Sequence, residues 1–132
     1  MIYLKKQEVR QLLVNVVEKN KKNIVVIEME NHKPLIFDTA SALDLAMSLN
    51  YHYQTTDIIL RKEAIINGFY DLSSGIAGEI LQKYINYDIH LAIVGDFNEG
   101  SQALKDFIRE ANKGNNFYFV STFEEAVECL GI

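Results

Sequence analysis

A short polar segment at residues 71–75, Asp-Leu-Ser-Ser-Gly, stands directly before a run of helically spaced apolar residues. Asp and Ser side chains at a helix start accept hydrogen bonds from backbone N–H groups, and each cap contributes about 1 kcal/mol. The same position stabilises an added phosphate group. Two interpretations of Ser73 therefore stand side by side, a helix cap and a phosphate acceptor. Residue preference alone favours the cap.

Two glycines, Gly75 and Gly78, fall in the same predicted helix. Glycine inside a helix costs about 1 kcal/mol relative to alanine, so this pair predicts that another backbone approaches closely. That backbone belongs either to a neighbouring helix of the same fold or to a docking partner. Of Phe69 and Tyr70, we expect one ring to be buried and the other to be a solvent-facing anchor. The predicted docking residues are Tyr70, Asp71, Ser74, Gly75 and Gly78.

A second kind of site is predicted beyond the ends of the apolar strands. Asp96 follows the apolar run at residues 89–94, and ligand sites of open α/β sheets gather at such strand ends. Arg61, Asp71 and Asp96 are the candidate residues for a small-molecule site there. A plain strand-ending turn at Gly95 and Asp96 is the simpler interpretation.

Metal, cofactor and nucleic-acid chemistry have little support in the sequence. The three histidines, His32, His52 and His90, share no metal-ligand spacing, and we interpret His90 as a sheet-surface residue. Phosphate-binding and dinucleotide-binding glycine motifs and the hydrolase Ser elbow are absent. The net charge is −5, from 18 acidic and 13 basic residues, with only small basic clusters. We expect no metal, no cofactor and no nucleic-acid partner.

The cellular setting is inferred from cysteine use and hydropathy. Cys129 is the only cysteine, which excludes an intramolecular disulfide and fits a reducing compartment. Its acidic neighbours argue against a reactive-thiol role. No apolar run approaches the roughly 18 residues that a membrane span needs. We expect a cytoplasmic chain with no membrane association.

The elements that position these residues follow from hydrophobic periodicity. β-branched runs at residues 12–18 and 24–29, separated by a polar spacer, predict an N-terminal β-hairpin. Helical spacing at residues 41–50 and 76–85 alternates with apolar strands at 56–60 and 89–94. Ser101 and Thr122 cap two further helices around a strand at 117–120, and Gly114 should close the first in the left-handed conformation.

This alternation predicts an α/β fold, because each helix is long enough to connect two parallel strands. We expect a mixed, mostly parallel sheet of five to six strands with about four helices. Residues 89–94 should lie centrally in the sheet, since they are nearly all apolar. The composition shows no linker or repeat, so residues 1–132 are expected to form one domain.

Several long motifs resemble an uncharacterised bacterial family known as domain of unknown function 4180. They occupy residues 69–84, 89–97, 103–114 and 117–130, and a shorter match covers residues 41–45. The resemblance implies membership over most of the chain beyond about residue 24. It implies no activity, because none is known to us for that family.

A more distant resemblance is to the STAS domain, the fold of bacterial anti-sigma-factor antagonists. It rests on Ile58-Ile-Leu60, on Leu72-Ser-Ser-Gly-Ile-Ala-Gly78 and on the order of the elements that follow. In that family a serine at this helix start is phosphorylated by a partner kinase, and Ser73 is the matching residue. Leu72 departs from the family pattern, which has aspartate there.

Three functions remain open. The first is a non-enzymatic, STAS-like regulatory module that binds a protein partner. The second is a small enzyme or ligand-binding protein with a carboxylate-lined site at the strand ends. The third is a structural domain that acts by self-association.

Overall fold

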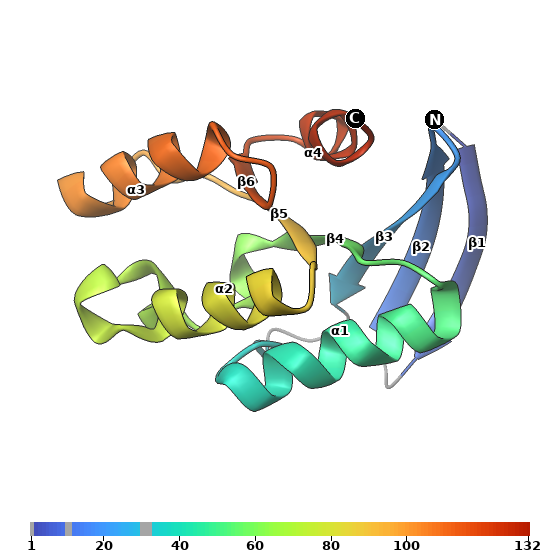
Figure 1. Cartoon of the computed structure of the whole chain (residues 1–132), viewed down its shortest axis with the longest axis horizontal. Coiled ribbons are helices and arrows are strands. Elements are labelled where there is room, and N and C mark those ends of the chain that lie inside the picture. Colours follow the sequence, from blue (N-terminus) through green and yellow to red (C-terminus); the bar gives the residue numbers. More distant parts are fainter. Residues whose placement is uncertain (1, 10–11, 30–32) are drawn as a thin grey trace.

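A computed structural model describes residues 2–9, 12–29 and 33–132 of the chain (Figure 1). Six strands form one sheet in the order β1-β2-β3-β4-β5-β6. The strands are β1 (Ile2–Val9), β2 (Leu12–Lys19), β3 (Lys22–Met29), β4 (Asp57–Arg61), β5 (His90–Val94) and β6 (Phe117–Val120). The helices are α1 (Thr39–Tyr53), α2 (Ile76–Asn86), α3 (Gln102–Asn112) and α4 (Phe123–Leu130).

The sheet is antiparallel at one side and parallel at the other. β1, β2 and β3 pair antiparallel, whereas β3, β4, β5 and β6 pair parallel through helical crossovers. The predicted hairpin is confirmed as β2–β3. Asn20 and Lys21 at its turn both have positive φ, 53° and 66°, as in the two-residue turn that matches strand twist.

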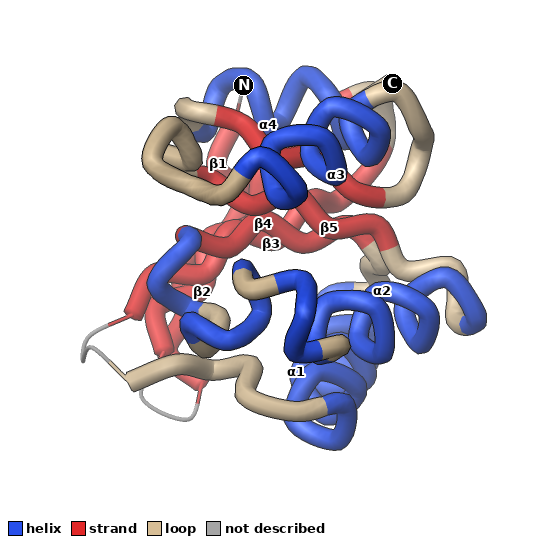
Figure 2. Tube along the Cα trace, turned by 90° about the vertical axis from the view of Figure 1, so that its left-hand side faces the viewer, coloured by secondary structure: helices blue, strands red, loops and turns tan. Residues whose placement is uncertain are grey.

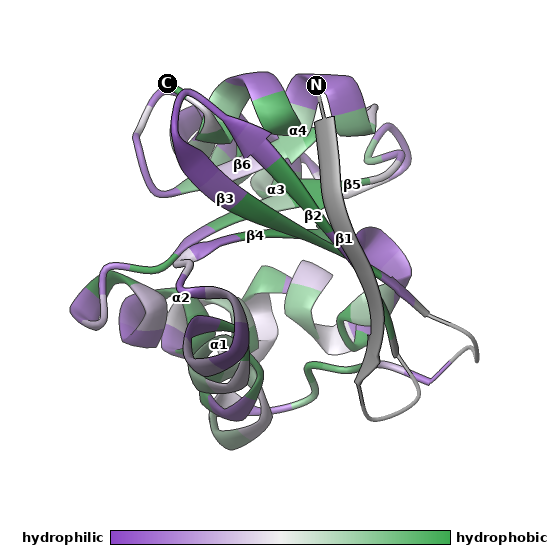
Figure 3. Ribbon diagram, turned by 90° about the vertical axis from the view of Figure 1, so that its right-hand side faces the viewer, coloured by the Kyte–Doolittle hydropathy of each residue, from purple (hydrophilic) through white to green (hydrophobic). Residues whose placement is uncertain are grey.

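Helices cover both faces of the sheet. α4 lies across the sheet from α1 and α2 (Figure 2). One core cluster joins α1 and α2 to one sheet face, and a second joins α4 to the other. Hydrophobic colouring follows β3, β4 and β5 where they cross the middle of the molecule (Figure 3). The expectation that residues 89–94 lie centrally is confirmed, because β5 runs between β4 and β6.

The free edge of β6 is covered by a side chain. The Asn112 side-chain nitrogen donates to the carbonyl of Phe119 at 3.1 Å, and its oxygen accepts from the N–H of Phe119 at 2.8 Å. Both outward-facing backbone groups of Phe119 are thereby satisfied, so at this residue a further strand has nothing to pair with.

Helix caps at Ser101 and Thr122 are confirmed, since each side chain accepts from the backbone N–H three residues on. The expected left-handed Gly114 is wrong. α3 ends at Asn112, and the Gly114 N–H instead closes a turn onto the Ala111 carbonyl at 3.0 Å. Within the part of the chain that the structure describes, every helix falls short of the length and apolar character of a membrane crossing.

Candidate functional site

The polar segment at residues 71–75 does not open α2 directly. Leu72–Ser74 form a 3₁₀ turn capped by Asp71, whose Oδ1 accepts from the Ser73 N–H at 3.2 Å. Gly75 then takes φ +79° and serves as the residue before α2. The expectation that Gly75 lies inside the helix is wrong. The left-handed conformation costs a residue with a Cβ about 1–2 kcal/mol, which accounts for glycine here.

The two serines of this segment have different environments. The Ser74 hydroxyl donates to the Gly68 carbonyl at 2.7 Å and accepts from the Ile76 N–H at 3.2 Å. Ser74 therefore holds the start of α2. Ser73 is exposed, and its hydroxyl donates only to Asp71 Oδ1 at 2.7 Å among the contacts described. Its oxygen is reachable from solvent.

Gly78 lies on the outer face of α2 with open space around it. A Cβ built on Gly75 or Gly78 would meet no described atom within 4 Å. The expectation that a neighbouring backbone of this chain packs there is therefore wrong for both glycines. The hollow beside Gly78 has a volume of about 550 Å³. We call this surface the α2 face, and it is lined by Thr39, Gly78, Glu79, Gln82, Lys83 and Asn86.

The aromatic pair before the segment divides as expected in one respect. Phe69 is buried, whereas Tyr70 is partly exposed. The Tyr70 hydroxyl donates to the Lys62 carbonyl at 2.8 Å. Burial, and to a lesser extent Glu63, raises the pKa of Tyr70 well above its usual value. Tyr70 is thus tied into the fold at its hydroxyl end and offers only part of its ring to a partner.

Arg61 and Asp96 lie together at the carboxyl ends of β4 and β5. Both line a hollow of about 450 Å³, to which Phe97 and Ser121 also contribute. The Arg61 guanidinium stacks 4.6 Å from the Phe123 ring centroid, and its Nη2 is 3.8 Å from Glu28 Oε1. Asp71, the third candidate residue, is not among the residues that line this hollow.

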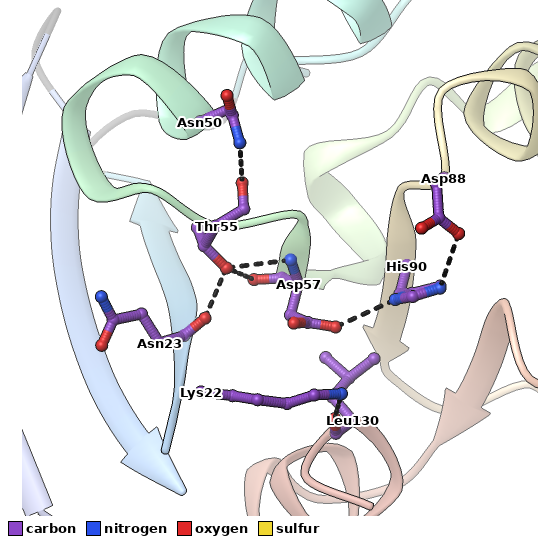
Figure 4. Close-up of polar contacts among 8 residues, drawn as sticks. All are labelled: Lys22, Asn23, Asn50, Thr55, Asp57, Asp88, His90 and Leu130. Atoms are coloured by element: carbon purple, nitrogen blue, oxygen red, sulfur yellow. Dashed lines mark hydrogen bonds and ion pairs between the residues drawn. The ribbon is translucent and has the colours of Figure 1, made fainter. Parts of the chain in front are cut away.

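At the amino ends of the same strands lies a polar cluster that the sequence interpretation missed. Asp57 and His90 are register partners on β4 and β5. His90 Nδ1 lies 3.1 Å from Oδ1 of Asp57, whose side chain is only 9% exposed. His90 Nε2 lies 3.4 Å from Oδ1 of Asp88, which is 90% exposed (Figure 4).

Thr55 fixes the backbone of Asp57, the residue that carries the buried carboxylate of this cluster. Its hydroxyl donates to the Asn23 carbonyl and accepts from the Asp57 N–H at 3.0 Å. The Asn50 side chain donates to the Thr55 carbonyl at 3.2 Å, so the end of α1 and the starts of β3 and β4 are joined (Figure 4). Thr55 is itself buried, and buried hydrogen bonds of this kind hold a single conformation.

A hollow of about 350 Å³ adjoins Asp57 and His90, with Tyr118 and Cys129 on its other walls. Burial raises the pKa of the Cys129 thiol, and Glu125 and Glu128 raise it further. The thiol therefore stays protonated at neutral pH, which argues against a nucleophilic role. In the described residues, no group of three or more His, Cys, Asp or Glu side chains is placed to hold a metal ion.

A register signal could have found this cluster. Asp57 opens the strand after α1 and His90 opens the next strand, and adjacent parallel strands joined by one crossover bring their first residues side by side. Interpreting His90 as a lone surface residue overlooked this pairing.

Comparison with known proteins gives one match. No curated protein and no solved structure matches the chain. The model of a family described as "Domain of unknown function (DUF4180)" matches residues 19–130, which include every candidate site above. The chain belongs to the DUF4180 family.

Proposed function

We propose that this domain is a non-enzymatic bacterial regulatory module that binds a protein partner through the α2 face. The observation that carries the proposal is Gly78. It is exposed, it lies within a regular helix, and the space its missing side chain leaves is unfilled by the described chain. Such a glycine costs about 1 kcal/mol relative to alanine. Close approach of a partner would explain why that cost is tolerated.

Ser73 is the proposed switch of this module, and it stands before α2, outside the residues that line the α2 face. It precedes α2 by one short turn, its hydroxyl is exposed, and Ser74 rather than Ser73 holds the helix start. Ser73 is therefore free to be modified with little effect on the fold. A phosphate there would add about −1.5 to −2 charges and replace the hydroxyl's bond to Asp71 with repulsion. The expected result is a local change of charge before the start of α2.

The proposal places the module in the bacterial cytoplasm. Its support is the lone Cys129, which can form no intramolecular disulfide, as is usual in a reducing compartment. The partner is either another protein or a second copy of the chain.

Affinity capture from the native cell tests this proposal. The wild-type domain and Ser73→Ala should retain the same partner, whereas Ser73→Glu should lose it. Ser121→Glu is the matched control, because Ser121 is also exposed but lines the hollow at the carboxyl ends of the strands. Equal retention by Ser73→Glu and wild type would refute a switch at Ser73. Loss with Ser121→Glu alone would move the interaction to the hollow lined by Arg61 and Asp96.

A second candidate function is small-molecule binding at the carboxyl ends of β4 and β5. The observation that favours it is the 450 Å³ hollow lined by Asp96 and by Arg61, whose guanidinium stacks on Phe123. A stacked guanidinium is well placed to bind a carboxylate or phosphate group. Arg61→Gln should then weaken ligand binding while leaving partner capture through the α2 face intact.

A further inference from the structure

We propose that the partner of the α2 face is a second copy of this chain, with the two α2 helices packed antiparallel about a two-fold axis. This inference rests on the proposed function, because it uses the same surface, and it names the occupant of that surface. Two-fold pairing is the commonest symmetry of protein oligomers, and it needs a surface whose features complement one another when the helix is reversed. The charges, the apolar contacts and the amides of α2 meet this requirement.

The charges of the α2 face are self-complementary. Among the residues that line it, Glu79 and Lys83 alone are charged, so the face carries one acid and one base on a chain whose net charge is −5. They stand one helical turn apart, a spacing that allows an ion pair within a helix. Within the described residues, however, neither side chain forms an ion pair. Both charges are therefore available to a second copy, in which each would meet its opposite.

One flank of α2 offers both a hole and an apolar side chain to fill it. Gly78 has open space where a Cβ would stand, and beside it lies the hollow of about 550 Å³. Ile85 lies about two turns further along the same helix, and its side chain is 45% exposed although it is large and apolar. Placing Ile85 in the hollow of a second copy would remove that apolar surface from water.

A single register satisfies both pairings. At about 100° per residue, Gly78 and Ile85 lie on one flank of α2, and Glu79 and Lys83 lie on the other. A two-fold axis perpendicular to antiparallel helices brings like flanks together, so Ile85 meets the flank that holds Gly78, and Glu79 meets the flank that holds Lys83. When Ile85 is level with Gly78 of the second copy, Glu79 lies within about 1.5 Å, the rise of one residue, of the level of Lys83.

The centre of this interface is polar and short. The same register brings Gln82 within one residue's rise of Gln82 of the second copy. Gln82 donates one N–H to Asn86 at 3.0 Å and keeps its oxygen and its other N–H for that neighbour. Because α2 has only 11 residues, we expect a weak dimer with a dissociation constant of about 100 µM. The chain is then mostly monomeric at about 5 µM.

Sedimentation equilibrium of the purified chain tests this pairing, and wild type should dimerise with that constant. Glu79→Lys and Lys83→Glu should each weaken dimerisation by about tenfold or more, because each variant places two pairs of like charges in its homodimer. An equimolar mixture of the two variants should associate about as strongly as wild type, since both pairs between them are of opposite charge. Such a rescue requires contact between two copies, and no change within one chain produces it.

Lys113→Glu is the matched control, because it makes the same change of net charge at an exposed lysine after α3. It should leave dimerisation unchanged. The pairing is overturned if wild type stays monomeric at about 1 mM, if either reversal at α2 has no effect, if the mixture does not recover, or if Lys113→Glu acts like Lys83→Glu. In each of these cases, loss of a different captured protein with Gly78→Gln would still support docking on the α2 face, so the two proposals fail separately.

Discussion

Replacing Gly78 by alanine should stabilise the protein. The residue is the third of α2, and an added Cβ would meet no described atom within 4 Å. The variant therefore gains helix propensity without a clash, and we expect the free energy of unfolding to rise by about 0.5–1 kcal/mol. For a domain of this size that is an increase in Tm of about 3 °C.

Gly75→Ala is the matched control. Its Cβ would also meet open space, but Gly75 has φ +79°, which alanine adopts only at a cost of about 1–2 kcal/mol. The two variants add the same methyl group three residues apart and should change stability in opposite directions. Urea unfolding of both measures the difference. If Gly78→Ala lost as much stability as Gly75→Ala, the α2 face would not be the open surface described here.

Three other changes test separate parts of the structure. Ser73→Ala should change the free energy of unfolding by less than about 1 kcal/mol. Ser74→Ala should lower it by about 1–2 kcal/mol, because the Ser74 hydroxyl bonds to two backbone groups. A larger loss of stability at Ser73 than at Ser74 would reverse the roles assigned to them. Asn112→Ala should lower the free energy of unfolding by about 1–3 kcal/mol, because it leaves the outward backbone groups of Phe119 unpaired. The exposed strand edge should then cause self-association that increases with protein concentration, as measured by light scattering. A variant that stays monomeric would show that this edge needs no cover. Alkylation of Cys129 by iodoacetamide should have its pH midpoint above that of a free thiol, because burial and neighbouring carboxylates raise the pKa, and a midpoint below it would contradict that environment.

Strand placement followed well from the sequence because its physical signals are local. Residues 89–94 are nearly all apolar, and only a central parallel strand buries both faces of such a run. The β2–β3 hairpin was equally clear, from two β-branched runs and a polar spacer. β1, at residues 2–9, was not predicted. Its Lys-Lys-Gln-Glu stretch lacks the apolar alternation by which a strand is identified.

The start of α2 shows where local signals are insufficient. Three residues, Asp71, Ser73 and Ser74, are all of the types favoured at a helix N-cap. Propensity alone does not show which of them directly precedes the helix. Gly75 decides it, because its positive φ separates the 3₁₀ turn from the helix. The spacing of Gly75 and Gly78 was interpreted as a sign of close packing. In the structure Gly75 supplies the left-handed backbone conformation, and Gly78 faces open space.

The candidate sites depend on distances between residues that are far apart in the sequence, and the sequence does not give these distances. Arg61 and Asp96 line the same hollow because they stand at the carboxyl ends of adjacent parallel strands, whereas Asp71 does not line it. Asp57 and His90 meet for the same geometric reason at the opposite ends. Their register became visible only once the strands were in place.

Binding of the captured partner to Gly78→Gln tests the central proposal most directly. Glutamine is a good helix former, so this variant should be at least as stable as wild type while its side chain fills the hollow of the α2 face. We expect the affinity for the partner to fall by about tenfold or more, which is about 1.4 kcal/mol. Undiminished affinity of this stably folded variant would show that no partner docks on the α2 face.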